Sequence, residues 1–415
     1  MKFTAKEIKN TSYRYIDLQE HFKEIRDYPE DEEAGLGFYN FEMLFEDEKE
    51  ILFAIKNTYR SDIYILDLAT FECKSQGSIE SYNPTEGDSL YLRGISMEKI
   101  YFDYRANDQE YVNGVYCCLE KRIIDRFQGA SDYDYLYLTD RYYIKSKDAF
   151  YWDEEKDQWN LDAELDRVYL YDRIEERDFE IFDEKIKNSY HTSSNHFVRR
   201  YKDEEYLLNF PFRRDPEDVE DMIRESYIEE VMNDPKEISY IKLDEFAETI
   251  KLGEDIPFKT LTSWKEISIL KPYFYFNYTS KSLDFSIYNL KNRTIEVLRP
   301  VFSDLGIRLE SLVTKSYAHL KSAMNVTYIG KETILAHKDY ETEILSPINK
   351  TIKHSRKETL IDFNENYYLI NGWDEDEDGE NFKEYTIVLD GSEKEIARLD
   401  GYFLKLEHED ILIKI

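Results

Sequence analysis

A strand–turn–strand pattern recurs along the chain about once every fifty residues. In each copy, an apolar and aromatic run such as IYILDL ends at a short polar turn, and a second run follows. Successive copies begin 43 to 70 residues apart, at Tyr13, Ile63, Val115, Val168, Ile238, Phe285, Thr342 and Tyr385. With 36 Tyr, 24 Phe and only 14 Gly, the composition favours half-buried strands over flexible linkers. A period of this length indicates one supersecondary unit that is copied along the chain.

Two further strand-like runs lie between successive hairpins. SLYLRGI and KIYFDYR follow the hairpin that begins at Ile63, and YLYLTDRYYIKS and AFYWDE follow the one that begins at Val115. Four strands in a unit of this length resemble the blade of a β-propeller, across nearly the whole chain. The resemblance implies an all-β fold in which residues 1–415 form a single propeller domain. It does not extend to a family, because the signatures of WD40 and kelch repeats are absent from the sequence.

The two ends of the chain complement each other. The last residues, GYFLKLEHEDILIKI, supply two strands without a hairpin after them, whereas Tyr13–Tyr28 supply a hairpin without strands before it. We therefore expect one sheet built from both termini, with the C-terminal strands inside and Tyr13–Tyr28 outside. Such a sheet would close the ring and protect its edges. Eight hairpins predict eight blades, and seven is the alternative because the copies at Thr342 and Tyr385 are weak.

Two segments interrupt the strand pattern with helical spacing. In residues 215–234, Asp215 and Pro216 suit a helix start, and an apolar stripe from Val219 to Val231 follows. In residues 303–322, leucines recur at helical spacing from Leu305 to Leu320. We predict helical insertions at both places. They would cover a blade, or alternatively offer a docking helix to a partner.

The acidic charge of the chain restricts its partners. The formal charge is −33, from 88 Asp plus Glu against 55 Lys plus Arg. Such a surface repels the phosphates of nucleic acids and of anionic membranes, so we expect neither as a ligand. Solubility alone explains a negative charge, and attraction of a cationic protein or ligand is the second interpretation.

The cysteines and the N-terminal residues predict a cytoplasmic protein. Cys73, Cys117 and Cys118 are too few for a disulfide framework, and no run approaches the length of a membrane-spanning helix. The first residues lack the apolar core of a signal peptide. Frequent Lys, Ile, Asn, Tyr and Glu suggest a bacterial genome rich in A and T.

One segment resembles a calcium-binding loop. In DEDEDGEN, Asp374, Asp376 and Asp378 precede Gly379, which matches the first half of the D-x-D-x-D-G pattern. The second half departs from it, because Tyr385 stands where an EF-hand has its Glu. Strand-like runs flank the segment, so a solvated hairpin turn is the alternative to a Ca²⁺ site. No other cofactor is indicated.

Catalytic motifs are absent from the sequence. It contains no nucleophile elbow, phosphate loop or dinucleotide-binding glycine pattern. His191 and His196 form the nearest histidine pair, and surface histidines explain them as well as a metal or catalytic pair does. Asp103, Arg105 and Asp140 lie near predicted inner strands, where enzymes on this architecture place catalytic groups, and they are equally consistent with surface charges.

Two classes of function remain. The first is a non-enzymatic binding or scaffold propeller that recognises a protein, in particular a cationic one, or a small ligand. The second is a carbohydrate-active enzyme or another hydrolase or lyase with its site on the propeller axis. A deep axial pocket with a carboxylate pair would indicate the enzyme, and a broad charged or aromatic face would indicate the binding module.

Overall fold

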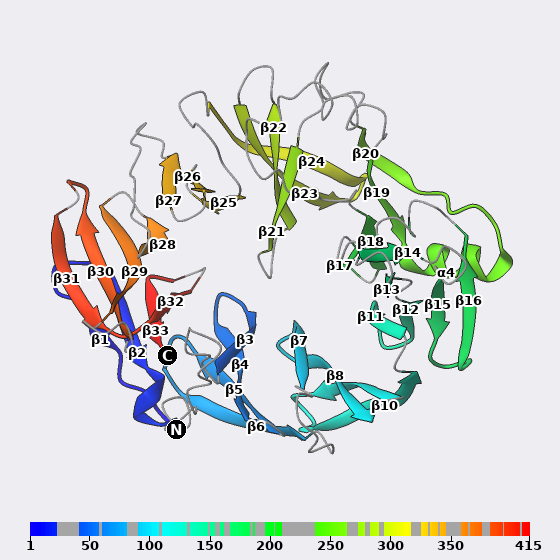
Figure 1. Ribbon diagram of the computed structural model, residues 1–415, viewed down its shortest axis with the longest axis horizontal. Helices are drawn as coiled ribbons and strands as arrows, with labels where there is room; N and C mark the ends of the chain where they lie inside the picture. Colours follow the sequence, from blue (N-terminus) through cyan, green and yellow to red (C-terminus); the bar gives the residue numbers. More distant parts are fainter. Residues whose placement is uncertain are drawn as a thin grey trace. The chain divides into compact units, whose positions relative to one another are not determined.

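A computed structural model of the chain consists mainly of antiparallel β-sheets (Figure 1). It describes residues 1–22, 41–57, 60–80, 90–107, 110–130, 133–147, 150–153, 158–161, 167–182, 186, 196–202, 204–209, 237–263, 273–278, 283–289, 294–316, 325–330, 333–338, 341–345, 358–363, 366–375, 382–392, 394–406 and 409–415. Within these residues, seven sheets have four strands, one has three and one has two. The four-stranded unit predicted from the repeat is therefore confirmed, as is the all-β class.

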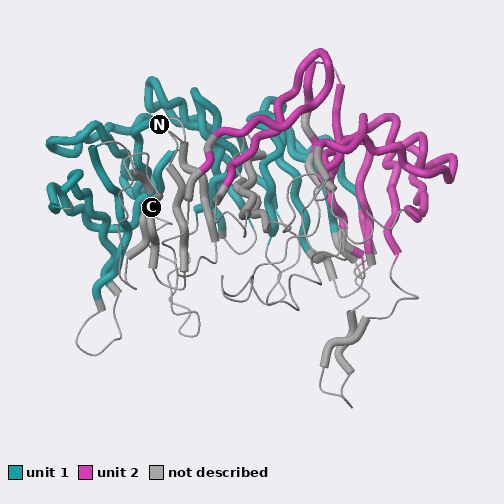
Figure 2. The backbone as a smooth tube through the Cα atoms, turned by 90° about the horizontal axis from the view of Figure 1, so that it is seen from above, with its two compact units in different colours: residues 1–107, 112–127, 326–415 teal, residues 108–111, 128–325 magenta. Residues whose placement is uncertain are grey.

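The chain divides into two compact units (Figure 2). Unit 1 comprises residues 1–107, 112–127 and 326–415, and unit 2 comprises residues 108–111 and 128–325. The expectation of a single domain over residues 1–415 stays a prediction, as do the number of blades and the closure of the ring.

Five sheets lie entirely or almost entirely in unit 1. Their strands are β1 Lys6–Glu7, β2 Arg14–Asp17, β3 Phe41–Glu46, β4 Glu50–Asn57, β5 Arg60–Asp67, β6 Cys73–Glu80, β7 Tyr91–Ser96, β8 Lys99–Asn107, β9 Glu110–Cys117, β10 Arg122–Ala130, β25 Asn325–Gly330, β26 Thr333–Lys338, β27 Glu341–Leu345, β28 Glu358–Phe363, β29 Tyr367–Glu375, β30 Phe382–Asp390, β31 Glu395–Asp400, β32 Phe403–Lys405 and β33 Ile411–Lys414. A short 3-10 helix, η1 Leu18–Glu20, follows β2.

Unit 2 holds the other four sheets and the helix α4. Its strands are β11 Tyr133–Tyr137, β12 Tyr142–Lys147, β13 Phe150–Asp153, β14 Gln158–Leu161, β15 Val168–Asp172, β16 Arg177–Ile181, β17 His196–Tyr201, β18 Glu204–Asn209, β19 Glu237–Lys242, β20 Lys259–Ser263, β21 Tyr273–Tyr278, β22 Leu283–Asn289, β23 Thr294–Ser303 and β24 Gly306–Ser316. The helix α4, Leu243–Leu252, lies between β19 and β20.

The strand β4 of unit 1 is buried on both faces, as consecutive apolar residues predict. In β4, Ile51, Leu52, Phe53 and Ala54 are all fully buried. Ile51 and Phe53 belong to one hydrophobic cluster, whereas Leu52 and Ala54 belong to a second. Alternate side chains therefore pack on opposite sides of the sheet.

Both termini contribute to one sheet, with the strand order β1–β2–β33–β32 (Figure 1). The prediction of a shared terminal sheet is thus confirmed, but the identity of its outer strands was wrong. The outer hairpin is β1–β2 instead of Tyr13–Tyr28, because the chain enters η1 directly after Asp17. The strand next to β33 is β2, the second strand of the β1–β2 hairpin, instead of the first. The chain direction of β2 is therefore the same as that of β33, and the two strands pair in parallel. Residues 23–40 lie outside the described residues.

The helix predicted over residues 303–322 is wrong for its described part. Ser303 and Gly306 close a tight hairpin between β23 and β24, and Gly306 has a φ of +118° that favours glycine. Alternation then places Ile307 and Leu309 on one face, where both pack in a cluster with Leu298. Of the leucines that suggested a helix, Leu305 lies in the turn, and Leu309 and Leu312 are strand residues of β24. The predicted helix over 215–234 lies outside the described residues.

The run YLYLTDRYYIKS contains two strands where one was expected. It forms the β11–β12 hairpin, and β12 pairs directly with β15. AFYWDE therefore supplies no strand to this sheet; β13 pairs with β14 in a separate hairpin. Thr139 and Asp140, in the middle of the run, form the turn that divides it.

The run ISYIKLDEFAETIKL is a strand followed by a helix, not the predicted hairpin. Leu243, Phe246, Ala247 and Ile250 of α4 are buried at helical spacing and join the core of unit 2. Asp244 and Glu245 lie in the first turn, where the helix dipole favours carboxylates. Gly253 ends the helix with a φ of +69°, and the amides of Gly253 and Glu254 donate to the carbonyls of Ile250 and Thr249.

Candidate binding site on unit 2

An aspartate closes several of the repeated strands and organises the turn that follows. The carboxylates of Asp17, Asp67, Asp172 and Asp390 each accept a hydrogen bond from the backbone amide two residues later, at 2.8 to 3.0 Å. This is the Asx-turn geometry that aspartate favours. The shared Asp of the repeat is therefore a turn residue.

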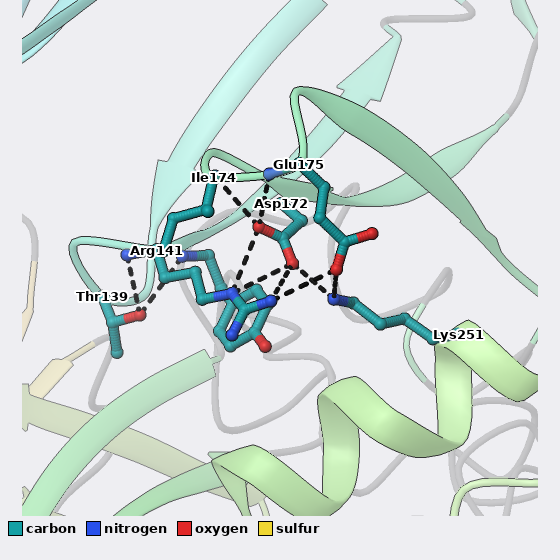
Figure 3. Close-up of polar contacts among 7 residues, drawn as sticks. Thr139, Arg141, Asp172, Ile174, Glu175 and Lys251 are labelled. Carbon is teal, nitrogen blue, oxygen red and sulfur yellow. Dashed lines mark hydrogen bonds and ion pairs between the residues drawn. The ribbon is translucent and has the colours of Figure 1, made fainter.

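Asp172 differs from the other three because its carboxylate also binds two cations (Figure 3). Oδ1 accepts from the amides of Ile174 and Glu175, at 3.0 and 3.2 Å. The Arg141 guanidinium donates to Oδ2 from Nε and Nη2, at 3.0 and 2.8 Å. Lys251 Nζ donates to Oδ2 as well. The side chain of Asp172 is fully buried, so these donors replace water around its charge.

Glu175 completes a cluster of two carboxylates and two cations. Its Oε1 lies 2.6 Å from Lys251 Nζ and 3.2 Å from Arg141 Nη2. Lys251 comes from the last turn of α4, whereas Asp172 and Glu175 lie at the turn between β15 and β16. The cluster therefore fastens the C-terminal end of α4 to the neighbouring sheet.

The cluster shifts the pKa values of Asp172 and Lys251. Burial alone would raise the pKa of Asp172, but the hydrogen bonds from Arg141, Lys251 and the two amides hold it well below its ordinary value. Burial would lower the pKa of Lys251, and its bonds to Asp172 and Glu175 raise it instead. Asp172 and Lys251 are consequently charged at neutral pH, which suits a structural anchor better than proton transfer.

A small groove lies beside this anchor. It has a volume of about 90 Å³ and is lined by residues 180–182, Ile250 and residues 253–256; we call it the β16–α4 groove. Ile181 and Ile250 are buried apolar residues of the lining, while Phe182 is 65% exposed. Glu180, Glu254 and Asp255 add carboxylates to the lining. Pockets for small ligands usually enclose about 300 to 1,000 Å³, so this groove suits a single side chain.

The sequence predicted neither the anchor nor the groove. Arg141, Asp172 and Lys251 are distant in sequence, and the helix that carries Lys251 was interpreted as part of a hairpin. The sequence nevertheless contains a signal for this helix. Its apolar residues Leu243, Phe246, Ala247 and Ile250 have the spacing i, i+3, i+4, i+7, and Gly253 follows them as a helix end.

Of the predicted calcium ligands, only Asp374 lies within the described residues. It stands near the end of β29, opposite Lys383 of β30, and its carboxylate is 3.7 Å from the Arg398 guanidinium. The hairpin position predicted for this segment is therefore confirmed. Asp376 and Asp378 lie outside the described residues, so the calcium site stays a prediction. Elsewhere in the described part of the chain, no three His, Cys, Asp or Glu side chains gather as metal ligands would.

The other predicted positions lie in different places. Asp103 and Arg105 belong to β8 of unit 1. Asp140 lies in the β11–β12 turn of unit 2, where its carboxylate accepts a 2.6 Å hydrogen bond from the Tyr137 hydroxyl. His196 begins β17, and His191 lies outside the described residues.

The three cysteines are buried and unpaired with one another. Burial raises the pKa of Cys73 and of Cys118 to about 12, so both remain protonated at neutral pH. Their burial indicates that these cysteines pack in the core. Within the described part of the chain, no helix is long and apolar enough to span a membrane.

No protein-family model and no curated protein sequence matches the chain. Its fold is similar to that of several solved structures at low sequence identity. One is an uncharacterised protein, lmo1340 of Listeria monocytogenes, with 9% identity, a TM-score of 0.38, and coverage of 83% of this chain and 93% of that one. A second is the C-terminal WD40 domain of Sif2, with 9% identity, a TM-score of 0.37, and coverage of 88% and 87%.

A third is the β-propeller domain of the Trilobed protease from Pyrococcus furiosus, with 10% identity, a TM-score of 0.34, and coverage of 76% and 81%. These likenesses are too distant to indicate a function. The successive four-stranded antiparallel sheets of the chain confirm its resemblance to the β-propeller architecture, without assigning a family.

Proposed function

We propose that the protein is a non-enzymatic binding module that recognises a partner protein with a basic surface. The observation that carries this proposal is the formal charge of −33 on a chain built of repeated four-stranded sheets. A field of this sign accelerates encounters with cationic partners and disfavours anionic ones. The β16–α4 groove supports the proposal, because it combines exposed apolar surface with carboxylates.

The electrostatics of unit 2 favour binding over catalysis at this site. The carboxylate of Asp172 is committed to Arg141, Lys251 and two backbone amides. A general acid or base needs a pKa near the working pH, whereas the pKa of Asp172 is strongly lowered. The cluster is thus suited to hold α4 in position while the neighbouring surface makes contacts.

Affinity capture tests the proposal. The tagged full-length chain is incubated with an extract of its native host at moderate ionic strength, and bound proteins are identified by mass spectrometry. An unrelated protein of similar size and net charge serves as the control for non-specific attraction of cations. We expect a stoichiometric basic partner that the control does not retain and that higher salt releases. Recovery of the chain alone, or with acidic partners only, would contradict the proposal.

A further inference from the structure

We infer that the β16–α4 groove accepts a lysine or arginine side chain from a basic segment of the partner protein, next to an apolar residue of the same segment. This inference rests on the proposed function. It adds the location of the binding site and the type of side chain that the site binds. Two properties of the groove lead to it, namely its apolar walls and its unmatched negative charge.

The walls of the groove suit the aliphatic part of a long cationic side chain. Ile181 and Ile250, which are 1% and 6% exposed, and Phe182, which is 65% exposed, are among the residues that line it. Lys and Arg bury their methylene groups along such surface while the charged end stays polar. The exposed ring of Phe182 can also attract the cation through its π-face. Leu252, next to Gly253, is 72% exposed and extends the apolar surface for a neighbouring residue of the partner.

The charge of the groove is not neutralised by its surroundings. Glu254 and Asp255 are exposed, and no ion pair joins either of them to another described residue. Lys251, the basic residue of the last turn of α4, is engaged with Asp172 and Glu175 instead. Glu180 has Arg167 in its vicinity. An incoming cation would therefore find at least two carboxylates that have no ion-pair partner among the described residues, which is the charge complementarity that a basic segment requires.

The groove is held in shape before any partner arrives. The amides of Gly253 and Glu254 are bonded to the last turn of α4, and Lys251 fastens this turn to Asp172 (Figure 3). Phe246 and Ile250 anchor the helix in the core shared with β15, β16 and β18. The residues of the groove consequently lose little conformational entropy when a side chain of the partner enters.

A peptide titration tests the inference. The probe is a fluorescein-labelled peptide with lysines and leucines alternating between Gly-Ser ends, and a second peptide carries Glu in place of each Lys. Binding to the full-length protein is followed by fluorescence anisotropy at about 50 mM salt, where screening is weak. We expect the lysine peptide to bind and the glutamate peptide not to bind.

Two pairs of variants locate the binding. Glu254→Lys should weaken binding of the lysine peptide about tenfold, as the loss of a charged contact does. Its control is Glu248→Lys, an equal charge change on the exposed side of α4 and outside the groove, which should change the affinity less than about threefold. Phe182→Ala should weaken binding about fivefold, while Leu305→Ala, at another exposed apolar residue outside the groove, should not.

The outcomes separate the inference from the proposed function. If the lysine peptide binds with the same affinity to Glu254→Lys and Glu248→Lys, and to Phe182→Ala and Leu305→Ala, the groove is not the site although the basic specificity stands. If the wild-type protein does not bind the lysine peptide, or binds both peptides equally, the charge-based recognition itself is overturned. Circular dichroism of each variant shows whether the fold is retained.

Discussion

Asp172 shows how a turn residue of the repeat acquires a second role. Like Asp17, Asp67 and Asp390, it accepts a backbone amide two residues later. In Asp172 alone of these four, both an arginine and a lysine donate to the other carboxylate oxygen at hydrogen-bonding distance. The added cations come from the β11–β12 hairpin and from α4, so the residue connects three parts of unit 2.

Asp172→Asn should destabilise unit 2 by about 2 to 3 kcal/mol. The amide can still accept from the turn, but Arg141 and Lys251 lose their anion in a buried place. The loss stays below that of a fully buried pair because Arg141 is 40% exposed. Asp304→Asn is the control, since the side chains of Asp304 and its partner Lys202 are 75% and 63% exposed and the pair should contribute less than about 1 kcal/mol. Urea unfolding measures both, and equal effects would contradict the anchoring role of Asp172.

The same carboxylate predicts a pH dependence. Because the folded pKa of Asp172 is lowered, its stabilisation is present above the unfolded pKa of about 3.9 and is lost as the pH falls toward the folded value. The difference in free energy of unfolding between wild type and Asp172→Asn should be constant from about pH 5 to 7 and shrink below about pH 4. Paired urea titrations at these pH values measure it. A difference that does not change down to about pH 3.5 would contradict the assignment.

At the residue scale, sequence reasoning found the local roles and missed the long-range ones. The recurring Asp at the strand ends was visible in runs such as IYILDL and VYLYD. Its partners Arg141 and Lys251 were not, because they are 31 and 79 residues away from Asp172. Only the packing of α4 against the neighbouring sheet brings these charges together.

The helix α4 is the element on which the proposed site depends. It replaces a plain connection between the third and fourth strands of its sheet, and it packs on β16 of the adjacent sheet as well as on its own β18. In the sequence ISYIKLDEFAETIKL, the apolar residues have strand spacing in the first half and helical spacing in the second half. Both halves were interpreted as strands. The reverse error occurred at residues 303–316, where Leu305, Leu309 and Leu312 have helical spacing. Leu305 lies in the tight turn, and the other two lie in β24.

Gly253→Ala should destabilise the protein by about 1 kcal/mol, because alanine is strained at a φ of +69°. A Cβ at this position meets no atom within 4 Å, so no steric clash is added. Gly253→Asn is the matched control, since asparagine tolerates the left-handed conformation and should cost clearly less than alanine. Thermal unfolding followed by circular dichroism compares the three proteins. Equal stability of the alanine and asparagine variants would contradict the role of Gly253 as the helix cap.

For the whole molecule, the repeat and the termini were the informative features. The period of about fifty residues predicted four strands in each unit, and seven sheets of the described residues have four. The pairing of the two chain ends was also predicted, although the choice of outer strands was not, because both sides of Asp17 contain strand-like residues. The acidic charge is a property of the full chain, and its interpretation as a means of attracting a basic partner remains a proposal.

Removal of residues 1–17 should destabilise unit 1 by more than about 5 kcal/mol. Phe3, Ile8, Tyr13 and Ile16 are all nearly or fully buried, and each such side chain contributes about 1.5 to 3 kcal/mol. The truncation also leaves β33 without its partner β2 and exposes a strand edge. Limited proteolysis should cleave the truncated chain much faster in unit 1, and a synthetic peptide of residues 1–17 should restore protection. Unchanged proteolysis would contradict the structural role of the terminal sheet.

Hydrogen exchange of the full-length protein, with and without the lysine–leucine peptide, shows whether the β16–α4 groove binds a basic segment. Exchange read by mass spectrometry locates the bound peptide without altering any residue of the chain. If the protein recognises a basic segment at the β16–α4 groove, peptides covering residues 180–182 and 250–256 should exchange more slowly, and salt should abolish the difference. Protection confined to other segments, or no protection at a saturating peptide concentration, would contradict the account.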